Sequence, residues 1–359
     1  NQSCKFHECA KAIDDFIINN LSQVYIPITR GELWDEDEEK KNRRLAIYAV
    51  LDNVLKTLDI LIHPFCPFTS EYLYQSVFDG EQSILLDKWP QFQESLVNEK
   101  IEESFDIMKD VVSVSSAARM KGKLKRRWPL NEAQICVKKG DKVKLESLSE
   151  LLQSQLNVEK FSVTETEKES GLEQILELKQ LGLPAKPTIE LERKKIGPKA
   201  KQHMGKLVAK FSETNPEEIV SALQKEKKFD FEIDGDIISL DNEDFIVNFD
   251  ASENFAMAKR DNYSVFISTL RNKEMMAKGL IKDIARRLQT LRKEKGYNPT
   301  DILNVASILD LDEESLEMIK EKAKDLAFLV RVKQVNFTDS CKEYKDDDID
   351  GQKIRISVE

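Results

Sequence analysis

The sequence predicts a multidomain, mainly α-helical protein in which a helical bundle over residues 1–128 precedes α+β domains. Apolar residues recur at helical spacing through the first part of the chain, whereas strand-like segments begin only beyond it. The later part also contains an internal repeat, because residues 101–164 and 279–338 are both predicted to form a helix with a basic end, a strand, a second helix and a second strand, in that order. We therefore expect a small α/β subdomain over 129–185, an α+β domain over 186–359 and a duplicated helix-strand-helix-strand unit.

Apolar stripes and helix-ending residues define the helices of the predicted bundle. A broad apolar face over 51–62 marks the second helix, which Pro64 and Pro67 end because proline cannot continue a helix. A third helix follows over 71–77, and a longer fourth one carries an apolar stripe over 101–112. The apolar face of the first helix consists of Ala10, Ile13, Ile17 and Leu21.

Strands and further helices follow beyond the bundle. The acidic run 165–170 and the prolines Pro184 and Pro187 mark a linker, and Asn215 caps a helix with Pro216 in its first turn. The expected strands are 133–137, 158–164, 229–233, 236–240, 245–249, 263–269, 302–308 and 330–337. The expected helices are 144–156, 280–294 and 313–327.

Composition excludes several classes of protein. The net charge is −10, and no stretch approaches the ~20 apolar residues that a membrane helix needs. Five scattered cysteines, an odd number, fit a reducing compartment, so we expect a cytoplasmic location. No signal peptide is recognisable, and the first residue is Asn1 rather than methionine, which predicts a piece of a longer protein.

Catalytic chemistry and cofactors are not expected in this chain. Cys4, His7 and Cys9 lack a fourth metal ligand nearby, so no metal site is predicted. The sequence has only three histidines, no glycine-rich phosphate loop and no spacing typical of a nucleophile with its base. The chain is therefore more typical of a binding protein than of a complete enzyme.

A basic cluster on this acidic chain is the first candidate binding site. Six of nine residues are cationic and repel one another, so an anion is expected against them, while Trp128 directly afterwards offers a stacking surface for a base. A solvated helix end is the alternative, and in a helical bundle tryptophan is more often part of the core. The cationic residues are Arg119, Lys121, Lys123, Lys125, Arg126 and Arg127.

A second basic helix end occupies the same position in the repeated unit. Lys282, Arg286, Gln289 and Lys293 fall on one face of the helix 280–294, a stripe that can follow a phosphate backbone. The alternative is a solvated face with an Asp283–Arg287 ion pair. Two further arginines are expected to widen the stripe, and two lysines form a third, weaker basic stretch. These are Arg287, Arg292, Lys199 and Lys201.

Local basic patches on an acidic body favour a folded RNA, bound at chosen points, over indiscriminate binding to long DNA duplex. Trp34 and Trp128 are the two aromatic residues that we expect to be able to stack on unpaired bases.

Several segments resemble the anticodon-binding helical domain of class I aminoacyl-tRNA synthetases. The stretch 15–21, with Tyr25, Arg30 and the Leu33-Trp34 pair, is similar to the opening of that domain. The same resemblance extends to Ala46-Ile47-Tyr48-Ala49-Val50-Leu51, to the run from His63 to Tyr74 and to Trp89-Pro90.

Later segments resemble isoleucyl-tRNA synthetases of the archaeal/eukaryotic type. These are 119–130, 156–159 and 279–301, so the resemblance covers nearly the whole chain. The chain departs from that family where 26–34 keeps Arg30 but lacks other positive charges, and where Trp128 replaces a usually polar residue. The zinc module that ends many bacterial enzymes is absent.

The resemblance implies the C-terminal half of an isoleucine-tRNA ligase, which charges tRNA(Ile) with isoleucine using ATP. The catalytic domain, with its ATP and Mg²⁺, and the editing domain would precede Asn1, so this chain alone is expected to be inactive. Its partners would be the anticodon arm of tRNA(Ile) and the rest of the polypeptide. A free-standing helical scaffold for protein partners and the equivalent part of a valyl-type enzyme are the alternatives. The expected tRNA-binding residues are Arg30, Trp34, Arg119, Lys121, Lys123, Lys125, Arg126, Arg127, Trp128, Lys199, Lys201, Lys282, Arg286, Arg287, Gln289, Arg292 and Lys293.

Overall fold

The computed structural model divides into two compact units, Asn1–Glu102 and Glu103–Glu359. Together their helices and sheets make the multidomain α+β architecture expected from the sequence. The division lies inside one long helix, and the expected boundaries at residues 128 and 185 remain predictions. Among the described residues no helix is long and apolar enough to cross a membrane. The described residues are 5–33, 37–78, 83–168, 170–339, 341–349 and 351–359.

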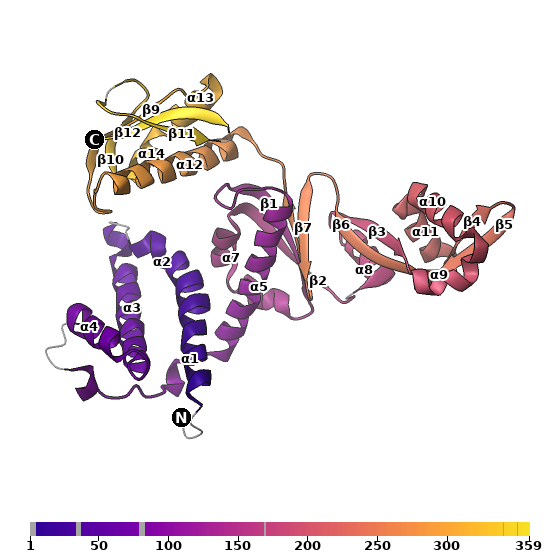
Figure 1. The fold of residues 1–359 in the computed structure, drawn as a ribbon, viewed down its shortest axis with the longest axis horizontal. Coiled ribbons are helices and arrows are strands. Elements are labelled where there is room, and N and C mark those ends of the chain that lie inside the picture. The colour runs from indigo at the N-terminus through magenta and orange to yellow at the C-terminus, as the bar shows by residue number, and fades with distance from the viewer. Residues whose placement is uncertain (1–4, 34–36, 79–82, 169, 340, 350) are drawn as a thin grey trace. The chain divides into compact units, whose positions relative to one another are not determined.

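The first unit is helical, and α3 is its central element. Figure 1 shows α3 between α4 and the helical stretch formed by α1, a π-helical segment and α2, and α1, α2 and α4 contact it. Glu71 of α4 accepts hydrogen bonds from Ser83 Oγ at 2.9 Å and from the backbone of Ile84 at 3.1 Å, which fixes the chain after α4. The elements are α1 (Phe6–Asp15), η1 (Phe16–Tyr25), α2 (Ile26–Leu33), η2 (Glu38–Lys40), α3 (Lys41–Ile62), α4 (Pro67–Val77), η3 (Ile84–Leu86) and η4 (Glu94–Leu96).

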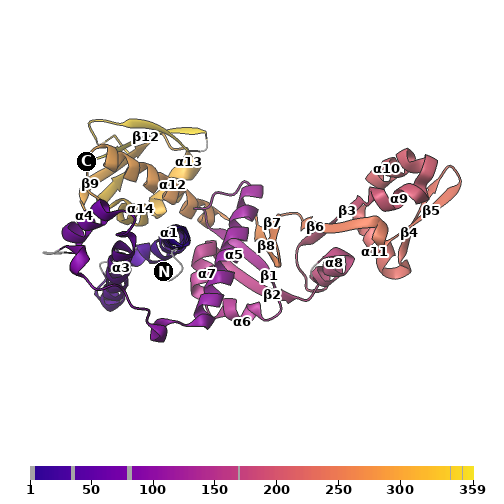
Figure 2. The ribbon, with the colours of Figure 1, turned by 60° about the horizontal axis from the view of Figure 1, so that its bottom comes forward.

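The second unit begins with α5 and a four-stranded sheet of order β2-β1-β8-β7. β1 and β2 are parallel, with Leu130 opposite Val158, because α6 and α7 return the chain between them. The hairpin β7–β8 adds antiparallel strands to the other side of β1. Figure 2 shows α5, α6 and α7 beside β1 and β2. The elements are α5 (Glu99–Lys121), β1 (Leu130–Lys138), α6 (Asp141–Glu146), α7 (Ser149–Leu156), β2 (Val158–Thr166), β7 (Phe255–Arg260) and β8 (Tyr263–Ser268).

A middle module, residues 171–251, lies in sequence between β2 and β7. Its two long strands pair antiparallel, with Ala185 opposite Ala251, and its core surrounds Phe231 and Ile175. The first sheet therefore combines strands from both sides of residue 185. The elements of the module are α8 (Gly171–Gln180), β3 (Ala185–Leu191), α9 (Arg193–Ala200), η5 (Lys201–His203), α10 (Met204–Glu213), α11 (Pro216–Glu226), β4 (Lys228–Ile233), β5 (Asp236–Asp241), η6 (Asn242–Asp244) and β6 (Phe245–Ala251).

The chain ends in a second four-stranded sheet, of order β10-β9-β12-β11. β9 and β10 are parallel and the hairpin β11–β12 is antiparallel to β9, as in the first sheet. The helix α12 lies along this sheet (Figure 1), and Ile284 and Leu288 on its inner face are fully buried in the shared core. The elements are α12 (Lys273–Glu294), β9 (Leu303–Leu309), α13 (Glu313–Glu321), α14 (Ala323–Val330), β10 (Val332–Asn336), β11 (Lys345–Ile349) and β12 (Gln352–Val358).

Candidate nucleic-acid interface

The basic cluster after α5 is a loop that turns the chain into β1. Lys123 adopts the left-handed backbone conformation, with φ of 52°, and the backbone N–H of Trp128 donates to the carbonyl of Lys125 at 3.1 Å. The side chains of Lys121, Lys123 and Arg126 are exposed. This loop therefore presents part of its charge to solvent.

Arg119 is buried beneath this loop and organises it. Its Nη1 donates to the carbonyls of Lys125 at 3.1 Å and Trp128 at 2.9 Å. Its Nη2 donates to the carbonyls of Leu156 at 2.8 Å and Asn157 at 3.1 Å, at the end of α7. Since only 3% of Arg119 is exposed, its role in the folded chain is structural rather than contact with a phosphate.

The electrostatics of Arg119 are consistent with this buried position. Burial, together with repulsion from Arg126 and Arg271, lowers the pKa of Arg119 to about 10. The group therefore stays cationic at neutral pH and adds positive potential beneath the exposed loop.

Arg292 makes the same set of contacts at the end of α12. Both arginines donate to the carbonyls six and nine residues further along the chain, which for Arg292 belong to Asn298 at 3.2 Å and Asp301 at 2.7 Å. Arg292 also donates to the carbonyls of Val330 and Arg331 at the end of α14. It is 5% exposed, so it does not widen the cationic face of its helix.

Trp128 is buried and enclosed by other side chains. Its indole Nε1 donates to Asp283 Oδ2 at 2.9 Å, and Lys125 Nζ and Arg271 Cζ lie 5.2 and 4.9 Å from its ring centroid. A Cβ on Gly279 would lie 2.3 Å from its ring, so α12 approaches the indole here only because it has glycine. With 7% of Trp128 exposed, the ring is a packing element and not an open platform for a base.

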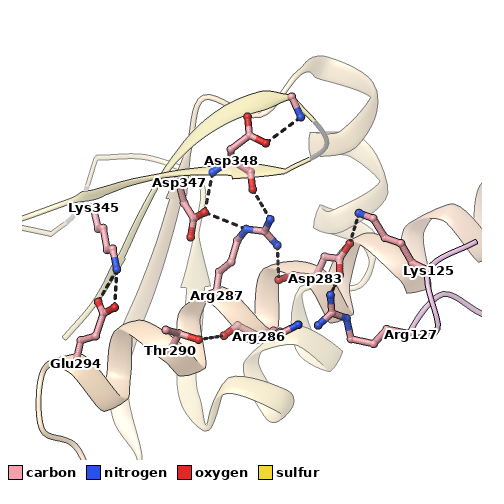
Figure 3. A network of polar contacts seen from close by, with 11 residues as sticks. Lys125, Arg127, Asp283, Arg286, Arg287, Thr290, Glu294, Lys345, Asp347 and Asp348 are labelled. Atoms are coloured by element: carbon pink, nitrogen blue, oxygen red, sulfur yellow. Dashed lines mark hydrogen bonds and ion pairs between the residues drawn. The ribbon is translucent and has the colours of Figure 1, made fainter. Parts of the chain in front are cut away.

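Asp283 of α12 holds two cations of the loop in place (Figure 3). Its carboxylate lies 2.8 Å from Lys125 Nζ and 3.1 Å from Arg127 Nη2. Burial alone would raise the pKa of Asp283, but hydrogen bonds from Lys125 and Trp128 and the charges of Lys125 and Arg127 outweigh burial and lower it. The carboxylate is therefore charged, and it partly neutralises the two half-buried cations.

The outer face of α12 continues the basic surface of the loop. Lys282, Arg286, Gln289 and Lys293 are all exposed, as their spacing predicted. Lys282 Nζ lies 3.4 Å from Asn157 Oδ1, and Asn157 Nδ2 donates to the carbonyl of Arg126 at 3.2 Å. Asn157 thus joins the helix stripe to the loop.

Lys282 lies close to other positive charges. Removal of water around its ammonium group, with repulsion from Arg119 and Lys278, lowers the pKa of Lys282. A negatively charged ligand would relieve that repulsion, which is the electrostatic arrangement expected of a phosphate-binding surface.

Arg287 faces away from the stripe and toward the C-terminal hairpin. Its Nε lies 3.2 Å from Asp347 Oδ1, its Nη1 donates to the carbonyl of Asp283 at 3.2 Å, and its Nη2 donates to the carbonyl of Asp348 (Figure 3). Arg287 is therefore anchored by Asp347 and by two backbone carbonyls, and not by an ion pair with the carboxylate of Asp283. Arg287 ties β11 to α12.

The remaining expected contact residues lie elsewhere. Arg30 is exposed on α2, whereas Trp34 lies outside the described residues. Lys199 forms ion pairs with Asp241 and Asp244 within the middle module, and Lys201 of the same module is exposed. Lys199 is therefore paired within its own module, and a contact of these residues with RNA remains a prediction.

Sequence reasoning missed Asn157, Arg271 and Lys278 as members of this surface. Asn157 has φ of 51° at the end of α7, and because asparagine tolerates this conformation, its presence after an expected helix is a sequence signal for a helix end. Within the described ranges no group of His, Cys, Asp and Glu side chains could hold a metal ion.

Comparisons with known proteins identify similar proteins for this chain. Residues 2–135 match the family model described as the anticodon-binding domain of tRNA ligase. The chain is 29% identical to isoleucine–tRNA ligase of Methanocella arvoryzae and 26% identical to that of Sulfolobus acidocaldarius, in each case over 99% of the chain and 32% of the relative. It is 30% identical to isoleucine–tRNA ligase of Methanothermobacter marburgensis over 76% of the chain and 25% of the relative.

The chain thus spans about a third of the length of these curated relatives. The resemblance to isoleucyl-tRNA synthetases of the archaeal type is confirmed, and residues 2–135 are similar to the anticodon-binding domain of tRNA ligases.

Proposed function

We propose that this chain is the tRNA-binding portion of an isoleucine–tRNA ligase and that it binds the anticodon arm of tRNA(Ile). The match of residues 2–135 to the anticodon-binding family and the names of the relatives support this function. Those names also favour isoleucine over valine as the amino acid. The full-length enzyme would charge tRNA(Ile) with isoleucine and ATP in the cytoplasm, and this chain alone would be inactive.

The observation that carries the proposal is the continuous exposed basic surface of the second unit. Lys121, Lys123 and Arg126 contribute to it from the loop, and Lys282 and Arg286 from α12. The loop is fixed from below by buried hydrogen bonds, so its cations need little further ordering to meet a phosphate backbone. The protein as a whole carries a net charge of −10, which discourages binding elsewhere.

The proposed tRNA-binding residues fall into groups with different roles. Lys121, Lys123, Arg126, Lys282, Arg286, Gln289 and Lys293 would meet the RNA directly. Arg30, Trp34, Lys199 and Lys201 remain proposed contacts outside this surface. Lys125 and Arg127 would add charge while staying paired with Asp283, and Arg119, Trp128, Arg287 and Arg292 would hold the surface in shape.

We further infer that the two four-stranded sheets and their preceding helices derive from a duplication. The shared strand order and the equivalent hydrogen bonds of Arg119 and Arg292 support this inference. Leu130 and Leu303 also donate in the same way, at 3.1 Å, to the carbonyls of Asn157 and Arg331.

Binding to tRNA tests the function. The chain should bind tRNA(Ile) more tightly than the same tRNA with a swapped anticodon. Affinity should fall with salt at a slope of about 0.7–0.9 per phosphate contacted. Arg126→Ala and Arg286→Ala should weaken binding and reduce the slope, whereas Lys186→Ala, an exposed lysine in the middle module, should not.

Other outcomes distinguish between the proposed function and its alternatives. Equal affinity for both tRNAs would restrict this chain to contacts with the RNA backbone. No binding at low salt would reject the proposal and favour a scaffold for protein partners, whose affinity would depend little on salt.

A further inference from the structure

An exposed apolar patch stands at the end of α14. Phe328 is 77% exposed, and its neighbour Leu329 and the residue before β9, Ile302, are 39% and 60% exposed. Most other apolar residues of α12, α14 and the second sheet lie in one core. The patch is therefore a separate surface feature.

The first sheet shows that the fold does not require this patch. The carbonyls of Leu156 and Val330 accept equivalent hydrogen bonds from Arg119 and Arg292, which aligns the end of α7 with the end of α14. In that alignment Ser154 and Gln155 stand where the second sheet has Phe328 and Leu329, and Pro129 stands where it has Ile302. The same backbone thus folds with polar or small residues at these positions.

Two lysines, one on α14 and one on α12, lie near the patch. Lys324 precedes Phe328 by one turn of α14 and is exposed, while the neighbouring Asp325 lies 4.0 Å from Lys322. Gln289 Nε2 donates to the carbonyl of Leu329 at 2.8 Å, which places the patch against the outer face of α12. Lys293 lies one turn further along that face.

We propose that Phe328 stacks on an unpaired nucleobase of the tRNA, so that the C-terminal sheet binds RNA directly; this rests on the proposed function. Stacking on an aromatic ring suits any base, and the adjacent lysines suit the phosphates on either side of it. A protein partner would be served by the apolar area but would not need the two adjacent lysines. The duplicated unit has thereby acquired a base-binding position that its counterpart lacks.

Substitutions of Phe328 test this proposal on the 359-residue chain. Phe328→Ala and Phe328→Leu should both weaken binding of tRNA(Ile) by at least about fivefold, because each removes the aromatic face. Phe328→Trp should bind within about twofold of the unmodified chain. Ile237→Ala, which removes a 68% exposed apolar side chain from the middle module, serves as the matched control and should change nothing. All four variants should keep the melting temperature, since these side chains are exposed.

Three results would overturn the proposal. Full affinity in Phe328→Ala would show that the ring makes no contact with RNA. Weak binding of Phe328→Ala with full affinity of Phe328→Leu would indicate apolar packing, as for a protein surface, instead of stacking. If the unmodified chain binds no tRNA, the proposed function itself fails. This outcome differs from failure of the stacking proposal alone, in which the unmodified chain binds tRNA and Phe328→Ala binds it equally well.

Discussion

At the scale of single residues, neighbouring charges in one run have opposite roles. Arg119 is buried against four carbonyls, while Arg126, seven residues later, is exposed. We expect Arg119→Ala to lower the free energy of unfolding by about 3 kcal/mol or more, because it leaves buried carbonyls without donors.

Urea denaturation would measure this change, with Arg126→Ala as the control within about 0.5 kcal/mol of the original chain. A loss below about 1 kcal/mol for Arg119→Ala would mean that water replaces the guanidinium at little cost.

The contact between Gly279 and Trp128 gives a second prediction. Gly279→Ala should destabilise the protein by about 1–3 kcal/mol, since the added Cβ would meet the indole at 2.3 Å and force the helix or the ring to move. Gly205→Ala in α10 is the matched control, because nothing lies within 4 Å of its added Cβ, and it should be neutral or stabilising by up to about 1 kcal/mol. Equal melting temperatures for the two variants would contradict this account.

The sequence identified the charged positions of the candidate site but not which of them are exposed. Arg119 and Arg126 look alike in a basic run, and what separates them is a set of carbonyls up to 38 residues away. Trp128 was expected as a possible stacking surface, and its burial depends on a glycine and an aspartate of α12, 151 and 155 positions along the chain. Such long-range partners leave no local signal.

At the scale of elements, local periodicity predicted the helices and the parallel strands well. β1, β2, β9 and β10 match expected strands, while the expected helix 144–156 divides into α6 and α7. The strands β3, β7, β11 and β12 were not predicted. β11 contains three consecutive aspartates, Asp346 to Asp348, which are typical of a solvated loop. In the structure this segment is a strand that pairs with β12 and contacts Arg287.

This dependence predicts a local effect of Arg287. Arg287→Ala should increase hydrogen exchange of the β11 and β12 amides, because it removes the contacts of α12 with Asp347 and with the carbonyl of Asp348. Arg286→Ala, one position away and exposed, is the control and should leave exchange unchanged. Equal protection in both variants would show that strand pairing alone holds the hairpin.

At the scale of the whole molecule, the α+β organisation was predictable and the pairing of distant strands was not. The expected boundary at residue 185, which followed prolines in the sequence, remains a prediction, and β3, which contains Pro187, pairs with β6 inside the middle module. Periodicity shows where a strand lies and not which distant strand it joins, so the combination of β1 and β2 with the hairpin β7–β8 had no signal in the sequence.

The position of the middle module has a consequence for how such a chain can grow. β2 and β7 are the two outer strands of their sheet, so the segment between them must cross about 14 Å, three strand spacings. In the second sheet, the outer strands β10 and β11 are joined by only the residues between Asn336 and Lys345. That short link shows how little chain the crossing requires. The segment between Thr166 and Phe255 is thus far longer than the crossing requires. Its residues Leu178, Leu183 and Ala185 share a buried core with Cys136, Met257 and Phe266 of the sheet, so the place where evolution or an engineer can exchange a domain without breaking a strand of this sheet lies beyond that core, between β3 and β6.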